Sequence, residues 1–218
     1  MAKARSNFVC QNCGASYPKW TGKCENCGEW NTLVEQIVET KGASAVARSH
    51  SRGKILKPQS MRSIAAEDSV RRLPTGIADL DTVLGGGILP AGVMLLAGQP
   101  GIGKSTLLMQ VAAHVSEQYA VLYVSGEESA SQVKLRATRL GATSGDDLQF
   151  VASTSADDIA ATIRSGQYKL VIIDSIQTLS LEEIASAPGT VSQITNSSNV
   201  IIRAAKASGA AVILVGSS

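Results

Sequence analysis

The sequence has few aromatic residues, no long apolar run and no marked excess of either charge. Aromatic residues make up 4% of the 218 residues, and 20 basic side chains nearly balance 18 acidic ones. The formal net charge of +2 neither requires nor excludes a nucleic-acid partner. No apolar run is long enough to span a bilayer, and no apolar stretch follows the opening MAKAR, which argues against a secretory signal. We therefore expect a cytoplasmic protein without a membrane partner.

Cysteine is confined to one short N-terminal stretch and is absent from the rest of the chain. The phrase CQNCG at residues 10–14 returns as CENCG at 24–28, with ten residues between the inner cysteines. Two CxxC pairs at this spacing are typical of a closed structural zinc site. Its ligands would be Cys10, Cys13, Cys24 and Cys27. Two disulfides are the alternative, which the lack of a secretory signal disfavours, and no βαβ pattern supports a thioredoxin-like redox motif.

Both tryptophans of the chain fall inside this cysteine module. Trp20 and Trp30 lie close to Lys19 and Lys23 in sequence. Such a group is suited to stacking and charged contacts with a nucleic acid or a protein. The alternative is that the tryptophans simply cover the zinc, and the sequence leaves both interpretations open.

The next stretch, residues 37–70, has poor apolar periodicity and is rich in small, polar and basic residues. This composition predicts a linker, which we interpret as a solvated tether rather than a phosphate-binding arm. The predicted organisation is therefore a four-cysteine zinc ribbon over 1–36, the linker over 37–70 and an ordered core over 71–218. His50 in the linker and His114 in the core have no partners that suggest metal binding or catalysis.

The most informative stretch of the core is GQPGIGKS at residues 98–105, which matches GxxxxGK[ST] at every fixed position. A short apolar run at 93–97 predicts a buried strand before it, and TLLMQVAAHVSEQ continues as a predicted helix. Glycines bring amide N–H groups close to phosphate oxygens, and a helix N-terminus favours an anion. The expected nucleotide-binding residues are Gly98, Gln99, Pro100, Gly101, Ile102, Gly103, Lys104, Ser105 and Thr106.

Three of these residues have distinct expected roles. Lys104 would reach the β- and γ-phosphates, Ser105 would ligate Mg²⁺, and Thr106 would add a contact near the α-phosphate. A second Mg²⁺ holder, in the Walker B role, is expected at Asp174, because LVIIDS at 170–175 predicts a buried strand that delivers a carboxylate at its end. The alternative role for this aspartate is to cap the following turn.

Two adjacent glutamates follow another predicted buried strand, at 121–124. One of them is expected to polarise the water that attacks the γ-phosphate, and we favour Glu127 narrowly over Glu128. Alternatively, both lie in the first turn of a helix running to Leu140 and stabilise its dipole.

The remaining pattern alternates between strands and helices. Strands are predicted at 148–152, 170–174 and 211–215, and helices at about 156–165 and before 207. An earlier helix is predicted near 77–84, capped by Thr75 and ended by the three glycines at 85–87. Repeated βα units predict a mostly parallel α/β sheet with helices on both faces and ligands at the carboxyl ends of the strands.

These motifs together resemble the RadA/Sms family of bacterial DNA-repair ATPases, in the RecA superfamily. The residues that carry the resemblance are CQNCG…KWTGKCENCGEWNT, TGIADLDTVLGGGILP, GQPGIGKST, YVSGEES, and VIIDSIQT followed by EEIASAPGTVSQ. The resemblance implies a RecA-like P-loop NTPase core preceded by a small rubredoxin-like zinc ribbon, with ATP, Mg²⁺ and Zn²⁺ as cofactors. It implies catalytic roles for Lys104, Glu127 and Asp174.

The resemblance also implies a function in homologous recombination. It suggests that ATP hydrolysis drives processing or branch migration of single-stranded or branched DNA, in a hexameric ring that works with recombinase or replicative helicase machinery. The family chain is about twice as long, and Ser217 stands where it usually has a histidine that senses the γ-phosphate. Two other classes stay open: a nucleotide-gated DNA- or protein-binding module with little turnover, and a RecA-like autokinase, which shares TGIxxLDxxLGGG.

Overall fold

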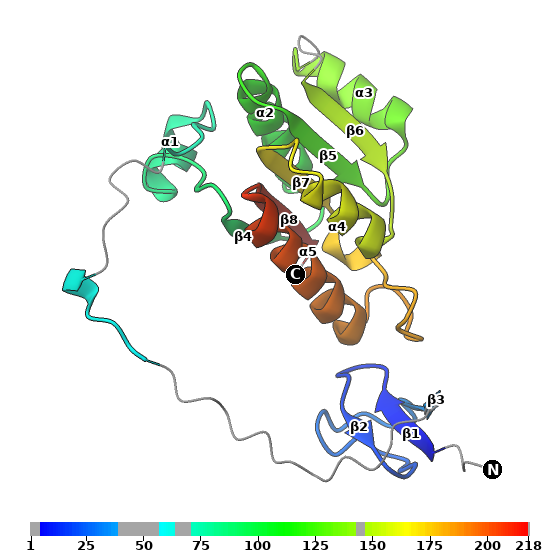
Figure 1. Ribbon diagram of the computed structural model, residues 1–218. Coiled ribbons are helices and arrows are strands. Elements are labelled where there is room, and N and C mark those ends of the chain that lie inside the picture. Colours follow the sequence, from blue (N-terminus) through cyan, green and yellow to red (C-terminus); the bar gives the residue numbers. More distant parts are fainter. Residues whose placement is uncertain (1–4, 39–56, 64–70, 143–146, 218) are drawn as a thin grey trace. The chain divides into compact units, whose positions relative to one another are not determined.

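The structure is a computed structural model, and it describes residues 5–38, 57–63, 71–142 and 147–217. The chain separates into two compact units, an N-terminal unit and one that contains residues 71–218 (Figure 1). Among the described residues, no helix combines the length and apolarity that a membrane crossing requires. His50 and most of the predicted linker lie outside the described residues. The described part of the linker contains the 3-10 turn η1, Met61–Ser63.

The N-terminal unit is a small antiparallel sheet with two tight turns, here called knuckles, formed by the CxxCG segments at residues 10–14 and 24–28. Its strands have the order β2-β1-β3 and run over Ser16–Tyr17, Arg5–Cys10 and Leu33–Val38. In each knuckle the first cysteine donates its N–H to a carbonyl five residues later, Cys10 to Ala15 at 2.9 Å and Cys24 to Glu29 at 2.8 Å. A glycine with positive φ follows each CxxC pair, as the repeated CxxCG pattern predicts.

The core contains a five-stranded parallel sheet with the order β4-β8-β7-β5-β6. Each strand was predicted from the sequence, and each prediction is confirmed to within about two residues. The strands are β4 Val93–Gly98, β5 Val121–Ser125, β6 Leu148–Ala152, β7 Leu170–Asp174 and β8 Ala211–Ser217.

Helices cover both faces of this sheet, which confirms the predicted α/β architecture (Figure 1). Along β5, Val121 and Tyr123 pack into the cluster that contains α2 and α3, whereas Leu122 and Val124 pack into the cluster that contains α4 and α5. This alternation is what a strand covered on both faces requires. The helices are α1 Ala78–Val83, α2 Lys104–Ser116, α3 Ala130–Arg139, α4 Ala156–Arg164 and α5 Val191–Ser208.

Two local predictions were wrong. The strand at 93–97 was expected to be buried, yet Leu95 is 65% exposed, because β4 lies at the edge of the described sheet and pairs only with β8. Thr75 is not the N-cap of α1, since Ile77 holds that position. The Thr75 hydroxyl instead accepts a hydrogen bond from the N–H of Ile77 at 3.2 Å, and the backbone N–H of Thr75 donates to Asp81 Oδ1 at 2.9 Å.

The segment before β4 is held to the end of α1 by one arginine and one glycine. The Arg72 guanidinium donates to the carbonyls of Leu84 at 2.9 Å and Gly87 at 3.1 Å. Gly87 has φ 121°, and a Cβ added there would lie 2.6 Å from the Leu73 carbonyl oxygen. Leu73 in turn exchanges two backbone hydrogen bonds with Ile88. Only glycine fits this close approach.

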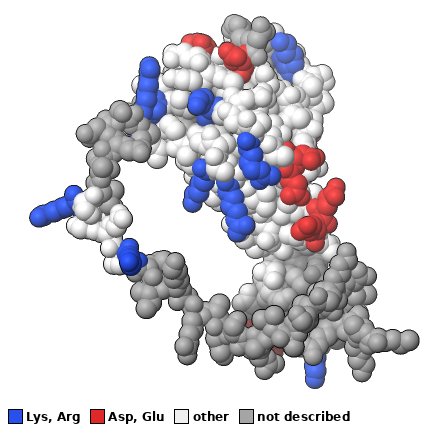
Figure 2. All heavy atoms as spheres, in the orientation of Figure 1, with Lys and Arg blue, Asp and Glu red and all other residues white. Residues whose placement is uncertain are grey.

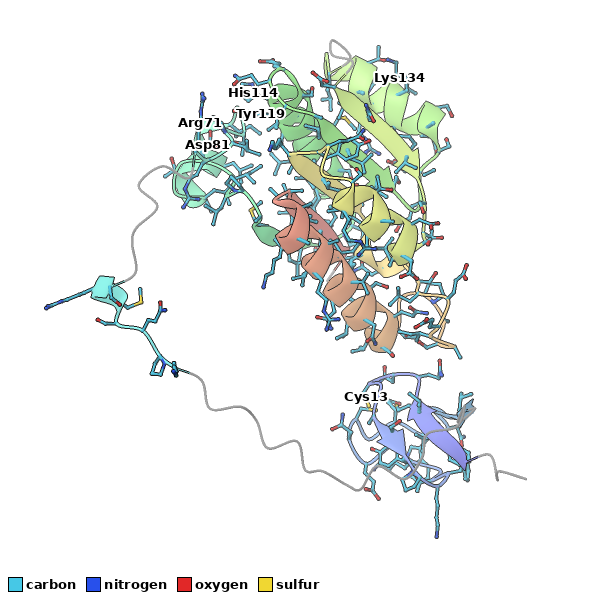
Figure 3. The ribbon with its side chains drawn as sticks, in the orientation of Figure 1. Cys13, Arg71, Asp81, His114, Tyr119 and Lys134 are labelled. Atoms are coloured by element: carbon cyan, nitrogen blue, oxygen red, sulfur yellow. The ribbon has the colours of Figure 1, made fainter. Side chains whose placement is uncertain are left out.

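His114 packs against the segment before α1. Its ring lies against Gly76, where an added Cβ would come within 2.5 Å of the His114 Cγ. Nδ1 of His114 lies 3.8 Å from the carboxylate of Glu117, which is three residues further along the chain. Figure 3 labels His114 near Asp81 and Tyr119, in the part of the core that contains α1 and α2.

Candidate nucleotide site and metal centre

The carboxyl ends of the parallel strands bring the predicted nucleotide-binding residues to one edge of the sheet. Gly98 at the end of β4 pairs with Ser217 of β8, and Ser125 at the end of β5 pairs with Asp174 of β7. Glu127 follows β5 by two residues. Ligands of parallel α/β sheets bind at this edge, so the phosphate loop and the two predicted carboxylates share the expected location.

The phosphate loop has the backbone geometry of an anion site. Gly101 and Gly103 have φ values of 79° and 100°, which residues with a side chain rarely adopt. Gly103 is the N-cap of α2; no side chain caps this helix and its first turn has no acidic residue. The N–H groups of the first turn are therefore available to phosphate oxygens.

Lys104 folds back over the loop from the first position of α2. Its ammonium group donates to the carbonyl oxygens of Gly98 at 2.6 Å and Gln99 at 2.8 Å. These bonds hold a positive charge directly beside the loop backbone. The loop residues around it, from Gln99 to Gly103, are exposed and accessible to a ligand.

Asp174 has a hydrogen-bond partner that sequence reasoning missed. The Tyr123 hydroxyl donates to Asp174 Oδ2 at 2.8 Å, and Tyr123 itself is only 1% exposed. Burial, and secondly the charge of Asp174, raise the pKa of the Tyr123 phenol far above its ordinary value, so the group remains a proton donor. The sequence feature that could have indicated this contact is the tyrosine within the predicted buried strand VLYVS, since a buried hydroxyl usually has a hydrogen-bond partner.

The two adjacent glutamates have different partners. Glu127 Oε1 accepts a hydrogen bond of 2.9 Å from the hydroxyl of Ser175, the residue directly after Asp174. Glu128 instead forms an ion pair with Arg136 of α3 through both carboxylate oxygens. Glu127 therefore lies beside the predicted magnesium ligand, and Glu128 is engaged with a helix. Sequence reasoning also missed Arg136, whose side chain is 16% exposed.

The alternative role proposed for these glutamates was wrong. Helix α3 begins at Ala130, and its first turn contains no acidic residue. Ser129 is the N-cap and forms a capping box with Gln132. The glutamates thus lie in the turn between β5 and α3. This turn borders an open pocket of about 420 Å³, which is lined by Ser125, Gly126, Glu127, Glu128, Ser129, Ala152, Ser153 and Thr154.

The donors at this edge suit a magnesium ion. Ser105 in the first turn of α2 and Asp174 at the end of β7 provide hydroxyl and carboxylate oxygens, the hard donors that Mg²⁺ prefers. Among the described residues, only Tyr123 hydrogen-bonds the Asp174 carboxylate, and it engages one of the two oxygens. The residues therefore fit a Mg²⁺ ion, whose presence stays a prediction.

The four cysteines of the N-terminal unit converge on one point. Their sulfur atoms all lie within 4.8 Å of one another. The sulfurs of Cys10 and Cys27 are 3.6 Å apart, well beyond a disulfide bond of about 2.05 Å. Two thiolates at about 2.3 Å from one zinc ion would lie about 3.8 Å apart in a tetrahedral site. The predicted four-cysteine metal site is thus confirmed as a cluster, and the distances suit a shared metal better than disulfides.

Two hydroxyl groups lie beside this cluster. The Thr32 hydroxyl lies 3.2 Å from the sulfur of Cys10, and the Tyr17 hydroxyl lies 3.4 Å from the sulfur of Cys24. Tyr17 also accepts the N–H of Asn26 at 3.0 Å. Contacts of this kind orient ligands around a bound metal. Cys10 and Cys24 are fully buried, whereas Cys13, labelled in Figure 3, is half-buried.

The tryptophans of this unit are exposed. Trp20 and Trp30 are 55% and 68% exposed, and their rings flank Gly22, where an added Cβ would lie 3.6 Å from Trp30 and 3.7 Å from Trp20. The Lys23 ammonium lies 5.8 Å from the centroid of the Trp30 ring. This exposure favours the interpretation of the pair as a contact surface over a cover for the metal.

Comparison with known proteins gives matches to both units. Residues 59–216 match the family described as AAA domain, and residues 8–35 match the rubredoxin metal binding domain. The DNA repair protein RadA of Brucella abortus is 47% identical over 223 residues, which cover 99% of this chain. The DNA repair proteins RadA of Pseudomonas aeruginosa and Escherichia coli are 45% and 41% identical over 99% of this chain. This chain belongs to the RadA/Sms family.

This RadA-family chain spans about half the length of the relatives it matches, namely 47% of the Brucella and Pseudomonas proteins and 48% of the Escherichia protein. A solved DnaB-like replicative helicase, whose interactions with primase were also studied, has a similar fold with a TM-score of 0.58. The alignment covers 70% of this chain and 46% of that chain at 18% identity, which shows the fold alone. The family and the RecA-like fold predicted from the sequence are both confirmed.

Proposed function

We propose that this RadA-family chain binds Mg·ATP at residues 98–106 and hydrolyses it in the service of DNA repair. One observation carries the proposal. Two glycines with positive φ precede a helix whose N-terminus has no side-chain cap, at the sheet edge where Asp174 and Glu127 also lie. Amide groups, a lysine and carboxylates are the parts that phosphoryl transfer requires, because its catalysis depends on positioning and charge neutralisation.

Each residue has a proposed role in this reaction. The loop amides and Lys104 hold the β- and γ-phosphates, while Ser105 and Asp174 hold the metal ion. Magnesium, when bound, supplies positive charge against the phosphate oxygens. Glu127 accepts the proton of the attacking water, and Ser175 orients its carboxylate through the 2.9 Å hydrogen bond. Glu128 holds the turn to α3 through Arg136.

The proposed DNA partner is single-stranded or branched DNA in homologous recombination, with branch migration as the outcome. Support comes from the relatives, which are DNA repair proteins. Trp20 and Trp30 are proposed to stack on unpaired bases, with Lys23 beside them. Figure 2 shows basic side chains over α5 with acidic ones beside them, so this face is not uniformly basic. A hexameric ring and contacts with recombinase or helicase machinery belong to the same proposal.

The deciding experiment is ATP turnover with and without single-stranded DNA. We expect turnover by the wild type, stimulation by DNA, and loss of both in Lys104→Ala, because the substitution removes the main protein charge on the transferring phosphate. The double variant Trp20→Ala/Trp30→Ala should keep basal turnover and lose the stimulation. Turnover that is unchanged in Lys104→Ala would refute the site assignment.

A second candidate function has one observation in its favour. Ser217, which pairs with Gly98 beside the phosphate loop, stands where the family usually has a histidine. Its carbonyl accepts a hydrogen bond of 3.1 Å from the Gln177 side-chain amide. A serine hydroxyl cannot supply the positive charge of a protonated imidazole to the γ-phosphate, which fits a nucleotide-gated binding module. DNA affinity that depends on ATP, without stimulated turnover, would identify this module.

A further inference from the structure

The hydrogen bond between Tyr123 and Asp174 joins the middle of β5 to the end of β7, its neighbour in the sheet. Tyr123 lies in β5 and pairs in register with Ile172 of β7, two residues before Asp174. Both Tyr123 and Ile172 pack into the cluster under α2, the helix that follows the phosphate loop. The phenol thus reaches along the buried face of the sheet, and its hydroxyl donates to Asp174 Oδ2 at 2.8 Å.

This contact differs from that of the other buried tyrosine in the core. Tyr168 is 6% exposed, and its hydroxyl donates to the Gln149 side-chain carbonyl at 2.6 Å. Tyr168 precedes β7, and Gln149 is the second residue of β6. This bond therefore lies toward the amino ends of the strands, opposite the phosphate loop. Both tyrosines satisfy a buried hydroxyl, but only Tyr123 does so on a predicted metal-binding carboxylate.

We propose that Tyr123 is a positioning residue for magnesium. Its hydroxyl holds one carboxylate oxygen of Asp174 and leaves the other oxygen to the ion or to a water bound to the ion. A carboxylate at the end of a strand can rotate about two side-chain torsions, and a fixed donor on one oxygen restricts that rotation. Partners that orient a metal ligand in this way typically change metal affinity by about 10- to 100-fold when they are removed. The inference rests on the proposed nucleotide site and specifies how its metal is held.

The test uses Tyr123→Phe, which removes the hydroxyl and keeps the ring, with Tyr168→Phe as the matched control. Binding of fluorescent mant-ADP would be measured during a titration with MgCl₂, and separately in EDTA. We expect the Mg²⁺ concentration that gives half of the maximal change in mant-ADP binding to rise about tenfold in Tyr123→Phe. In Tyr168→Phe this concentration should stay at the wild-type value. Affinity in EDTA should equal that of the wild type in both variants.

Other results would overturn the proposal. Unchanged Mg²⁺ dependence in Tyr123→Phe would show that the bond does not position the ion. Equal weakening with and without Mg²⁺, or loss of the folded circular dichroism spectrum, would assign the bond a structural role only. Failure of the proposed function gives a distinct result: the wild type itself would bind no mant-ADP under either condition, and both proposals would fall.

Discussion

Glu127 and Glu128 are neighbouring identical side chains whose contacts differ, and we propose different roles for them on that basis. The sequence predicted one catalytic carboxylate in this pair but could decide between them only narrowly. The partners that distinguish them lie outside the local motif: Ser175 is 48 residues from Glu127, and Arg136 is eight residues from Glu128. No local pattern contains this information, because it arises when β5 and β7 pair and α3 folds back on the turn.

Replacing each glutamate with glutamine should therefore have different effects. We expect Glu127→Gln to lower ATP turnover by about 100-fold or more, because a general base is removed, with ATP affinity nearly unchanged. Glu128→Gln should keep most turnover and lower the free energy of unfolding by about 1–3 kcal/mol, since Arg136 loses its charged partner. Steady-state kinetics and urea denaturation measure the two effects. The reverse pattern would exchange the proposed roles.

The elements of the core were predictable to different degrees. Strands β5, β7 and β8 were located correctly because buried parallel strands are short apolar runs bounded by polar residues or glycine. Strand β6 was also located correctly, although it lies at an edge of the sheet and none of its residues is buried. The edge position of β4 was not predictable, since strand order depends on pairing between distant segments. The glycines after α1 were recognised as a helix end, but the contact of Gly87 with the Leu73 carbonyl appears only in the folded chain.

A pair of glycine substitutions tests this contact. Gly141 also has positive φ, 68°, but an added Cβ there meets no atom within 4 Å. Gly141→Ala should thus cost only the backbone strain, about 1–2 kcal/mol. Gly87→Ala should cost at least about 1 kcal/mol more, because its Cβ also collides with backbone. Thermal or urea unfolding compares them, and equal destabilisation would mean that the Leu73 segment moves aside without cost.

The molecule as a whole combines two units with different sources of stability. The core contains two large apolar clusters, one on each face of its sheet. The N-terminal unit buries few side chains apart from cysteines among its described residues, so metal binding is expected to supply most of its folding free energy. The predicted boundaries at residues 36 and 70 stay predictions.

Zinc removal tests this separation with a convenient signal. Both tryptophans of the chain, Trp20 and Trp30, lie in the N-terminal unit, so tryptophan fluorescence reports on that unit alone. A strong zinc chelator should shift this fluorescence toward that of unfolded tryptophan. The helical circular dichroism and the melting temperature of the core should stay nearly constant. A parallel loss of helical signal would show that the two units fold together.

The central claim is that residues 98–106 bind the phosphates of ATP, and calorimetric titration with Mg·ATP tests it most directly. Lys104→Ala would be compared with Lys206→Ala, which removes an exposed lysine from the last turn of α5, before β8 begins. We expect Lys104→Ala to weaken binding at least about tenfold, because a charge-assisted contact with phosphate is lost, and Lys206→Ala to bind like the wild type. Equal affinities for all three proteins would contradict the account.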